Sequence, residues 1–206
     1  MISKSSIRLK LFNDLKFNAS QLEKIDDFVA LLLSYNKKYN LISKNSEKSV
    51  WNRHILDSAQ LVKHIDFKNC KSIADFGSGA GLPGILLSIY ADNHKFHVKL
   101  YEKSPVKCDF LNNVIKKLNI KAKVINNDLH REEVTSDYIV ARAFKKMPDF
   151  LTISREIIKK PCKIIILKGK NAQEDVNKSL KQSKFKYKLE KSITDDESKI
   201  LILDFE

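Results

Sequence analysis

The first seventy residues carry apolar positions at helical spacing. Ser20 and Glu23 have the separation of a capping box, in which two side chains satisfy the free amides at a helix start. The apolar residues that follow recur every three or four positions: Leu22, Ile25, Phe28, Val29, Leu32 and Leu33. This spacing places them on one face of an amphipathic helix. We therefore expect residues 1–70 to form an N-terminal helical cap.

From Ser72 onward, short apolar strands alternate with amphipathic helices. Strands are expected at 72–76, 97–102, 122–126, 138–141 and 163–168. Helices are expected from near Pro83, from Ser104 and Pro105 as cap and first-turn proline, from near Pro148, and over 172–182. This βαβ alternation predicts a parallel sheet with helices on both faces and right-handed crossovers.

The C-terminal pattern is different. Residues 187–193 and 200–205 read as strands, and the polar run Thr-Asp-Asp-Glu-Ser at 194–198 separates them. Two strands joined by a short turn predict an antiparallel hairpin. The whole pattern predicts a Rossmann-like α/β fold, in which a mostly parallel seven-stranded sheet ends in this hairpin. Residues 71–206 are expected to form one compact domain.

The composition fits one globular domain with an extension. The chain has 206 residues, of which 43% are hydrophobic, so it can bury a core. No apolar run approaches the roughly 20 residues of a membrane span, and residues 1–4 lack the apolar stretch of a signal peptide. We expect a soluble, cytoplasmic protein with no membrane partner. The three cysteines, Cys70, Cys108 and Cys162, share no CxxC spacing, so neither a disulfide framework nor a metal site is expected.

The charge of the chain is strongly positive, with a formal net charge of +13. Such an excess favours a polyanionic partner such as RNA, because contacts of Lys and Arg with phosphate release counterions. Many of the lysines, such as Lys37-Lys38 and Lys116-Lys117, could equally solvate helix faces. The charge therefore favours nucleic acid binding without settling it.

Four of the five glycines lie between Gly77 and Gly84, directly after the first expected strand. Glycine permits positive φ and has no Cβ, so this cluster indicates backbone amides that approach a ligand closely. Read from Gly79, the run matches the dinucleotide fingerprint GxGxxG. Read from Gly77, it places Asp75 two residues before the first glycine. An acidic residue there suits a cofactor with a positive centre, whose ammonium group it helps to orient.

Glu102 ends the next expected strand, where a carboxylate can bind ribose hydroxyls. Both NAD and S-adenosylmethionine use that contact. The terminal hairpin, and the lack of a separate region for a hydride-transfer substrate, favour S-adenosylmethionine. The cofactor-binding residues expected from this reading are Asp75, Gly77, Ser78, Gly79, Gly81 and Glu102.

Two later strand ends carry further candidates. Asp128 could accept a hydrogen bond from the adenine amino group and Leu129 could contribute an amide or apolar contact, although Asp128 could equally cap a short helix. Arg142 could hold cofactor or RNA, or pair with a carboxylate at the edge of the core. Phe144 could stack on a base. Arg142 and Phe144 are positioning candidates, and no residue is assigned as a catalytic acid or base.

The residues disfavour two acceptor classes. The segment at 141–144, Ala-Arg-Ala-Phe, lacks the Asn or Asp followed by Pro-Pro and an aromatic residue that adenine amino-group methylation requires. Methylation at pyrimidine C5 needs a cysteine nucleophile, and Cys162 precedes the fifth strand, at the edge remote from a cofactor. The absence of an obvious base suits an acceptor with a free lone pair, such as guanine N7, where alignment is the main requirement.

A polar cluster lies in the run 51–58. Arg53, His54 and Asp57 are three or four residues apart and so share a helix face. This helix could close over the cofactor, or it could be a polar surface. His54 with Asp57 has no evident third partner, which disfavours a metal site.

Five runs, in this order, resemble the bacterial small-subunit ribosomal RNA methyltransferase G family, also called glucose-inhibited division protein B. They are Asn-Leu-Ile-Ser at 40–43, Arg-His-Ile-Leu-Asp-Ser at 53–58, Asp-Phe-Gly-Ser-Gly-Ala-Gly-Leu-Pro-Gly at 75–84, Ala-Arg-Ala-Phe at 141–144 and Leu-Lys-Gly at 167–169. The resemblance covers nearly the whole chain. It implies a class I methyltransferase that uses S-adenosylmethionine to methylate N7 of a guanine in 16S rRNA. It also implies that Gly77, Leu82, the region of Asp128 and Arg142 line the cofactor site.

The resemblance also suggests an RNA face, with Lys168 as a candidate beside Arg53 and His54. The chain departs from the family at 78–81, where the family more often has Thr-Gly-Pro-Gly. It also departs at 127–130, where the family usually has an arginine, a small residue and a glutamate, and this chain does not show that pattern clearly. We expect 16S rRNA or the small ribosomal subunit as partner, and a monomer. The alternatives are an NAD(P)-dependent oxidoreductase and a non-catalytic basic RNA-binding protein.

Overall fold

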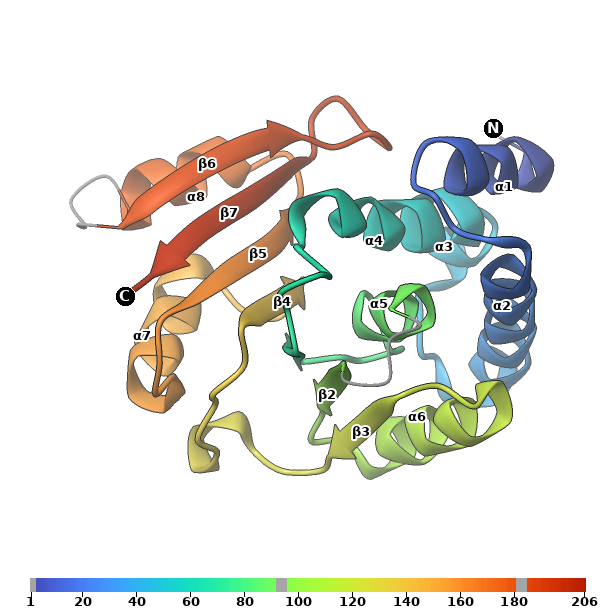
Figure 1. Cartoon of the computed structure of the whole chain (residues 1–206), viewed down its shortest axis with the longest axis horizontal. Helices are drawn as coiled ribbons and strands as arrows, with labels where there is room; N and C mark the ends of the chain where they lie inside the picture. Colours follow the sequence, from blue (N-terminus) through green and yellow to red (C-terminus); the bar gives the residue numbers. More distant parts are fainter. Residues whose placement is uncertain (1–2, 92–95, 181–184) are drawn as a thin grey trace.

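A seven-stranded sheet forms the centre of the computed structural model, which describes residues 3–91, 96–180 and 185–206 (Figure 1). The strand order is β3-β2-β1-β4-β5-β7-β6. Strands β1 to β5 run parallel, and β7 is antiparallel to both β5 and β6. The bounds are β1 Ser72–Phe76, β2 His97–Tyr101, β3 Ala122–Ile125, β4 Tyr138–Arg142, β5 Cys162–Lys168, β6 Lys186–Lys191 and β7 Lys199–Phe205.

Helices cover both faces of the sheet (Figure 1). Their bounds are α1 Lys4–Asn13, α2 Ala19–Tyr39, α3 Lys44–Glu47, α4 Asp57–Ala59, α5 Gly84–Tyr90, α6 Pro105–Leu118, α7 Met147–Ile157 and α8 Ala172–Ser179. A π-helical turn, η1 (Trp51–Leu56), leads into α4, and the 3-10 turns η2 (Gln60–His64) and η3 (Leu129–Arg131) follow α4 and β3. The predicted α/β class, the parallel sheet and the terminal hairpin are confirmed, and the predicted strand bounds agree within two residues.

Two hydrophobic clusters lie on the two faces of the sheet, because successive strand residues point to opposite sides. Ile73 and Val98 belong to the cluster that also holds residues of α1, α2, α5 and α6. Ala74 and Phe76 belong to the other cluster, with residues of α7 and α8. Since both faces are covered, the central strands β4 and β5 are apolar at most positions, as expected for a parallel sheet, whereas the edge strand β6 is mostly charged and exposed.

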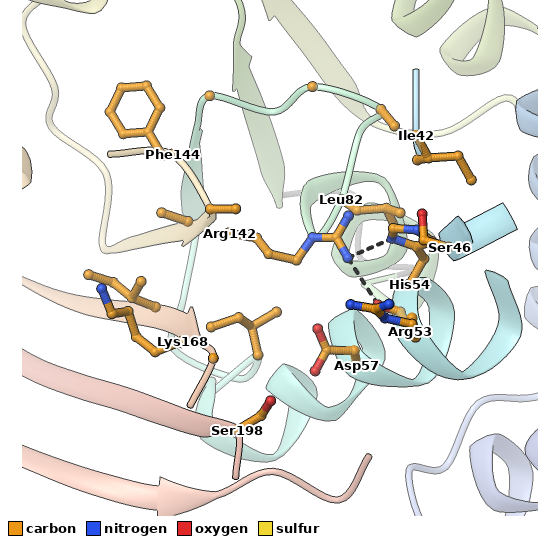
Figure 2. A pocket seen from close by; sticks show the side chains of 18 of the residues that line it. Ile42, Ser46, Arg53, His54, Asp57, Leu82, Arg142, Phe144, Lys168 and Ser198 are labelled. Atoms are coloured by element: carbon orange, nitrogen blue, oxygen red, sulfur yellow. Dashed lines mark hydrogen bonds between the residues drawn. The ribbon is translucent and has the colours of Figure 1, made fainter. Parts of the chain in front are cut away.

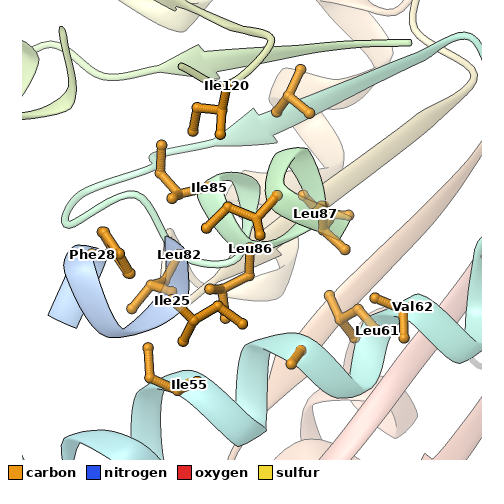
Figure 3. Close-up of a cluster of buried hydrophobic side chains, with 14 of the residues drawn as sticks. Ile25, Phe28, Ile55, Leu61, Val62, Leu82, Ile85, Leu86, Leu87 and Ile120 are labelled. Atoms are coloured by element: carbon orange, nitrogen blue, oxygen red, sulfur yellow. The ribbon is translucent and has the colours of Figure 1, made fainter. Parts of the chain in front are cut away.

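The N-terminal helices share the first of these clusters. Ile7 of α1 and Leu32 of α2 are fully buried in it. Figure 3 shows Ile25 and Phe28 of α2 near Leu82, and Leu86 of α5 in the same group of side chains. The helical segment is therefore packed into the body of the protein, while the division of the chain at residue 70 stays a prediction.

The start of α2 differs from the prediction. The N-cap is Asn18, whose side chain accepts from the amide of Gln21, and the Gln21 side chain accepts from the amide of Asn18. The capping box expected at Ser20 and Glu23 is thus wrong by two residues, because Asn and Gln form an equivalent box earlier in the chain. The end of the helix predicted over 172–182 falls partly on residues 181–184, outside the described residues.

Within the described residues, no helix is both long and apolar enough to cross a membrane.

The order of the strands in the sheet indicates where a ligand binds. Strands β2 and β3 follow on one side of β1, and β4 and β5 follow on the other. The order thus reverses between β1 and β4, and ligands of open α/β sheets bind outside the carboxyl ends of strands at this kind of switch point.

Candidate functional site

A cavity of about 1140 Å³ opens at the carboxyl ends of β1, β4 and β5 (Figure 2). The glycine loop supplies one wall, and the segment after β4 supplies another. The turn between β6 and β7 and the helical segment η1–α4 complete it. Lining residues used below are Arg53, His54, Asp57, Gly77, Gly79, Leu82, Arg142, Phe144, Lys168, Asp175, Thr194 and Asp195.

The glycine loop is held in a conformation that requires glycine. Gly77 and Gly79 have φ values of 69° and 57°, in the left-handed region that other residues rarely adopt. The Ser78 amide donates to the Tyr101 carbonyl at 3.0 Å, which ties the loop to the end of β2. A Cβ added to Gly79 would meet nothing closer than the Gly77 carbonyl at 3.7 Å. The loop is therefore fixed by hydrogen bonds and open toward the cavity at Gly79.

Asp75 lies beneath this loop with no exposed surface. Its Oδ2 accepts from the Gly84 amide at 3.0 Å, and its buried Oδ1 has no hydrogen-bond partner among the described residues. Burial raises the pKa of Asp75 to about 7, although the Gly84 amide and Arg142 oppose that shift. Asp75 does not line the cavity, so the structure gives it the role of supporting the loop. A direct contact with an ammonium group stays a prediction.

Glu102 is nearly buried just after β2 and also supports the loop. One carboxylate oxygen accepts from the Gly79 amide at 2.9 Å, and the other accepts from the Ser104 amide at 2.8 Å. Both oxygens thus have a backbone donor. Its predicted contact with ribose stays a prediction.

Phe144 lies directly over Gly77. A Cβ built on Gly77 would overlap the ring Cδ2 and come within 2.9 Å of Cε2. Ala143, at φ 48°, turns the chain back after β4 and so directs the ring to this place. The ring also contacts Phe76 and Phe150 edge-on, with centroids 6.4 Å away in both cases. Phe144 is therefore held at the cavity wall, where a role in base stacking stays a prediction.

Arg142 projects from the end of β4 to the helical segment. Its Nη1 donates to the Arg53 carbonyl at 3.2 Å and lies 2.8 Å from His54 Nδ1 (Figure 2). Burial, with smaller effects of Arg142 and Arg53, lowers the pKa of His54 to about 3. His54 is therefore neutral at pH 7, and its Nδ1 can accept from the guanidinium. Arg142 thus bonds a carbonyl and an imidazole instead of the carboxylate considered from the sequence, and no ion pair of Arg142 occurs in the described part of the chain.

Asp57 joins the helical segment to the terminal hairpin. Its Oδ1 accepts from Gln60 Nε2 at 3.0 Å and from Thr194 Oγ1 at 3.1 Å. Burial raises the pKa of Asp57, while nearby Arg142 lowers it. The sequence did not predict Gln60 and Thr194 as site residues. No local pattern indicates that this helix meets a turn more than 130 residues further along the chain. Arg53, His54 and Asp57 do share the cavity wall, as their spacing suggested.

Lys168 lines the cavity at the end of β5 with a side chain that is only 13% exposed. It forms an ion pair with Asp175 of α8. Because that charge is already partnered, Lys168 is a weaker candidate for an open RNA surface than its motif suggested. Its contact with RNA stays a prediction.

The two adenine candidates lie away from the cavity. Asp128 is exposed and caps η3, with its Oδ1 accepting from the His130 amide at 3.2 Å. This is the capping alternative considered from the sequence. The Leu129 side chain is buried in the cluster with α7. The Leu129 side chain is therefore not available to a ligand, and both adenine contacts stay predictions.

The cysteines show no sign of nucleophilic activation. Burial raises the pKa of Cys162 to about 11 and that of Cys70 to about 12, and it also raises the pKa of Cys108. Cys162 is the first residue of β5, at the end of the strand opposite the cavity. Among the described residues, no group of three or more His, Cys, Asp or Glu side chains is arranged to hold a metal ion.

A family model described as GidB, rRNA small subunit methyltransferase G, matches residues 21–201. Relatives named ribosomal RNA small subunit methyltransferase G include the protein of Orientia tsutsugamushi (strain Ikeda). It is 36% identical over 192 residues, which cover 92% of this chain and 94% of the relative. The protein of that name from Pelagibacter ubique (strain HTCC1062) is 36% identical over 185 residues, or 87% of this chain and 86% of the relative.

Solved structures share the fold at lower sequence identity. A SAM-dependent methyltransferase from Aquifex aeolicus superimposes with a TM-score of 0.61 at 15% identity, covering 78% of this chain and 94% of the other. A mutant of MtNAS in complex with S-adenosylmethionine gives a TM-score of 0.55 at 16% identity, covering 98% of this chain and 84% of the other. At these identities the likeness supports the architecture alone.

Proposed function

This chain belongs to the rRNA small subunit methyltransferase G family, and we propose that it transfers a methyl group from S-adenosylmethionine to N7 of a guanine in 16S rRNA. The observation that carries the proposal is the extent of the family match. Residues 21–201 include every segment that lines the cavity, from the helical wall to the β6–β7 turn. The match therefore covers the whole candidate site.

The residues at the switch point fit a sulfonium nucleoside cofactor. The left-handed residues Gly77 and Gly79 line the cavity with backbone alone, and the site of a Gly79 Cβ is open. Beneath the loop, buried Asp75 keeps one oxygen that has no hydrogen-bond partner among the described residues. Gly77, Ser78, Gly79, Gly81 and Leu82 would hold the amino-acid end, with Asp75 and Glu102 supporting them and Arg142 facing them from β4. The region of Asp128 and Leu129 is proposed for the adenine end.

S-adenosylmethionine, when bound, supplies a methyl group on positively charged sulfur. A guanine N7 carries a free lone pair, so the protein need not remove a proton before attack. The chain's own task is then to place the base in line and to exclude water. Arg142 and Phe144 are proposed as the positioning residues. Neutral His54 is proposed to fix the guanidinium of Arg142 through the 2.8 Å contact.

The charge of the chain supports the RNA substrate. Cationic side chains at the cavity include Arg53, Lys107, Lys145 and Lys170. Together with the net charge of +13, they would attract the phosphates around the target base. Arg53, His54 and Lys168 remain the proposed RNA-facing residues of the site. The proposal includes a monomeric protein that acts in the cytoplasm on 16S rRNA or the small subunit.

Labelled methyl transfer tests the proposal. The purified chain is incubated with methyl-labelled S-adenosylmethionine and with free 16S rRNA, assembly intermediates or intact small subunits. The modified nucleotide is then mapped by mass spectrometry. We expect label on one guanine as 7-methylguanine. Cofactor binding without transfer to any of these substrates would contradict the proposal, and salt-sensitive RNA binding without cofactor affinity would indicate a non-catalytic RNA-binding protein.

A further inference from the structure

Three carboxylates line the cavity, and their surroundings differ. Asp175 is ion-paired with Lys168. Asp195 is exposed in the β6–β7 turn, and its Oδ1 accepts from the Glu197 amide at 2.8 Å. Asp57 is half-buried, and no described residue donates a hydrogen bond to its Oδ2. Asp57 is therefore the carboxylate best placed to accept hydrogen bonds from a ligand.

The orientation of the Asp57 carboxylate is fixed by hydrogen bonds to its Oδ1. Gln60, which is buried, donates to its Oδ1 and also accepts from the Ile193 amide at 2.9 Å. Thr194 donates to the same Oδ1 from the β6–β7 turn. In Figure 2 the Asp57 carboxylate projects from the helical segment into the pocket, below the guanidinium of Arg142. The bonds to Oδ1 thus hold Oδ2 toward the pocket before any ligand binds.

Asp57 belongs to the side of the cavity away from the glycine loop. Its partner Thr194 lies in the turn that leads into β7, whereas Gly77 immediately follows β1. In the sheet order, β4 and β5 lie between β1 and β7. If the glycine loop holds the cofactor, as the proposed function requires, Asp57 faces the space that remains for the methyl acceptor.

The chemistry of guanine matches a fixed carboxylate. Its Watson–Crick edge presents two adjacent donors, N1–H and the 2-amino group, and flipped bases are commonly read by hydrogen bonds to this edge. An ionised carboxylate only accepts, and Oδ2 of Asp57 has two lone pairs for these donors while Oδ1 keeps its bonds from Gln60 and Thr194. N7 lies on the opposite side of the purine and stays free to face the methyl group. We propose that Asp57 recognises the Watson–Crick edge of the target guanine and so determines the specificity of the site.

The same contact would strengthen during the reaction. N7 uses its lone pair to form the new N–C bond and no proton leaves, so the base gains the positive charge that the sulfonium loses. A positively charged ring makes N1–H a better donor. Asp57 therefore binds the methylated base more tightly than the unmethylated one, which is the direction that assists the chemical step.

Nucleotide binding tests this proposal without requiring turnover. The full chain, saturated with S-adenosylhomocysteine, is titrated by calorimetry with guanosine 5′-monophosphate and with inosine 5′-monophosphate, which lacks the 2-amino group. We expect roughly tenfold preference for the guanine nucleotide, the size of one hydrogen bond to a charged acceptor. The 7-methylated guanine nucleotide should bind more tightly still at a pH low enough for its N1 to keep the proton.

In Asp57→Asn, the preference for guanine over hypoxanthine and the preference for the 7-methylated base should both fall close to one. The asparagine amide group would face the N1–H and 2-amino donors of guanine with a donor of its own. Asp57→Glu keeps the carboxylate and should retain part of both preferences. Asp195→Asn removes the cavity carboxylate of the β6–β7 turn and should leave both preferences unchanged. Thermal unfolding of each variant, and its affinity for S-adenosylhomocysteine, show whether fold and cofactor site are intact.

Equal binding of the two nucleotides by the unmodified chain would overturn the proposal, as would an undiminished preference in Asp57→Asn. Loss of S-adenosylhomocysteine binding with the preference intact would instead assign Asp57 to the cofactor site. Failure of the proposed function has a different signature. It would appear as nucleotide preference without methyl transfer to any small-subunit rRNA substrate.

Discussion

The Phe144 ring occupies the space that a side chain at Gly77 would need. This contact joins the loop after β1 to the segment after β4 across the switch point. Replacing Gly77 by Ala therefore meets two penalties, a left-handed φ and a clash with the ring. The first costs about 1–2 kcal/mol for an L-residue.

We expect Gly77→Ala to lower stability and cofactor affinity together. In the double variant with Phe144→Ala, the clash disappears and only the backbone strain remains. A double-mutant cycle by urea denaturation should then give a coupling energy of about 0.5–3 kcal/mol. Strict additivity of the two substitutions would show that the ring does not press on the loop.

Gly79 and Gly84 should respond differently to a side chain. Gly79 is open toward the cavity, so Gly79→Val should block cofactor binding while the fold persists at a cost of about 1–2 kcal/mol from its positive φ. Gly84 is enclosed, and a Cβ there would lie 2.6 Å from Asp75 Oδ2. Gly84→Ala should therefore reduce stability first. Calorimetric titration with S-adenosylmethionine and thermal unfolding separate the two effects, and wild-type affinity in Gly79→Val would refute this placement of the loop.

Arg142→Ala should reduce activity more than stability. The guanidinium faces the cavity, and the partners that it bonds, His54 and the Arg53 carbonyl, are both uncharged. Loss of a charged hydrogen bond of about 1.5–3 kcal/mol corresponds to roughly 10- to 100-fold in kcat/KM. Arg142→Lys keeps the charge without the planar fork and should recover little. A large fall in unfolding free energy with activity preserved would instead mark Arg142 as a structural residue.

His54 and Asp75 make stability depend on pH in opposite directions. The folded pKa of His54 is about 3, below its ordinary 6.5, so its contribution to stability is lost as the pH falls through that window. The folded pKa of Asp75 is about 7, above its ordinary 3.8, so its contribution is lost as the pH rises from about 4 to 7. The two effects largely cancel where the windows overlap.

Replacing either of these two groups should reveal the pH dependence of stability that the other one causes. Asp75→Asn should make the unfolding free energy fall toward acid by as much as about 1.4 kcal/mol per pH unit, and His54→Gln should change the slope in the opposite sense. Urea denaturation between about pH 4 and 6.5 measures both slopes. Parallel pH profiles for the two variants would contradict the assigned protonation states.

The sequence predicted the architecture because the fold depends on local patterns. Apolar runs with intervening amphipathic helices specify parallel strands, and the glycines after β1 identify the end of the sheet that binds a ligand. Each of these signals lies within a few residues and survives errors of one or two positions. The box at Asn18 and Gln21 shows the limit of such signals, since two adjacent segments satisfied the same rule.

The details of the site depend on contacts that no local pattern encodes. Asp75 and Asp57 are both acidic and near motifs, but only the packed structure shows that the first is enclosed under the loop and the second faces the cavity. Leu129 follows a strand end like the other candidates, yet its side chain turns into the core. The meeting of Asp57 and Thr194 requires the hairpin to close against a helix formed far earlier in the chain.

The shared core of the N-terminal helices also constrains when this protein can fold during synthesis. Ile7 lies in the same hydrophobic cluster as Ile165 of β5 and Ile200 of β7. The first helices leave the ribosome long before those strands exist, and non-local contacts of this kind form slowly. Helices α1 and α2 pack instead on η1, α5 and α6, so their apolar faces can be buried once residue 118 has been made. The part of the cluster contributed by β5 and β7 joins later, after β7 has been synthesised, so this core is assembled in two stages.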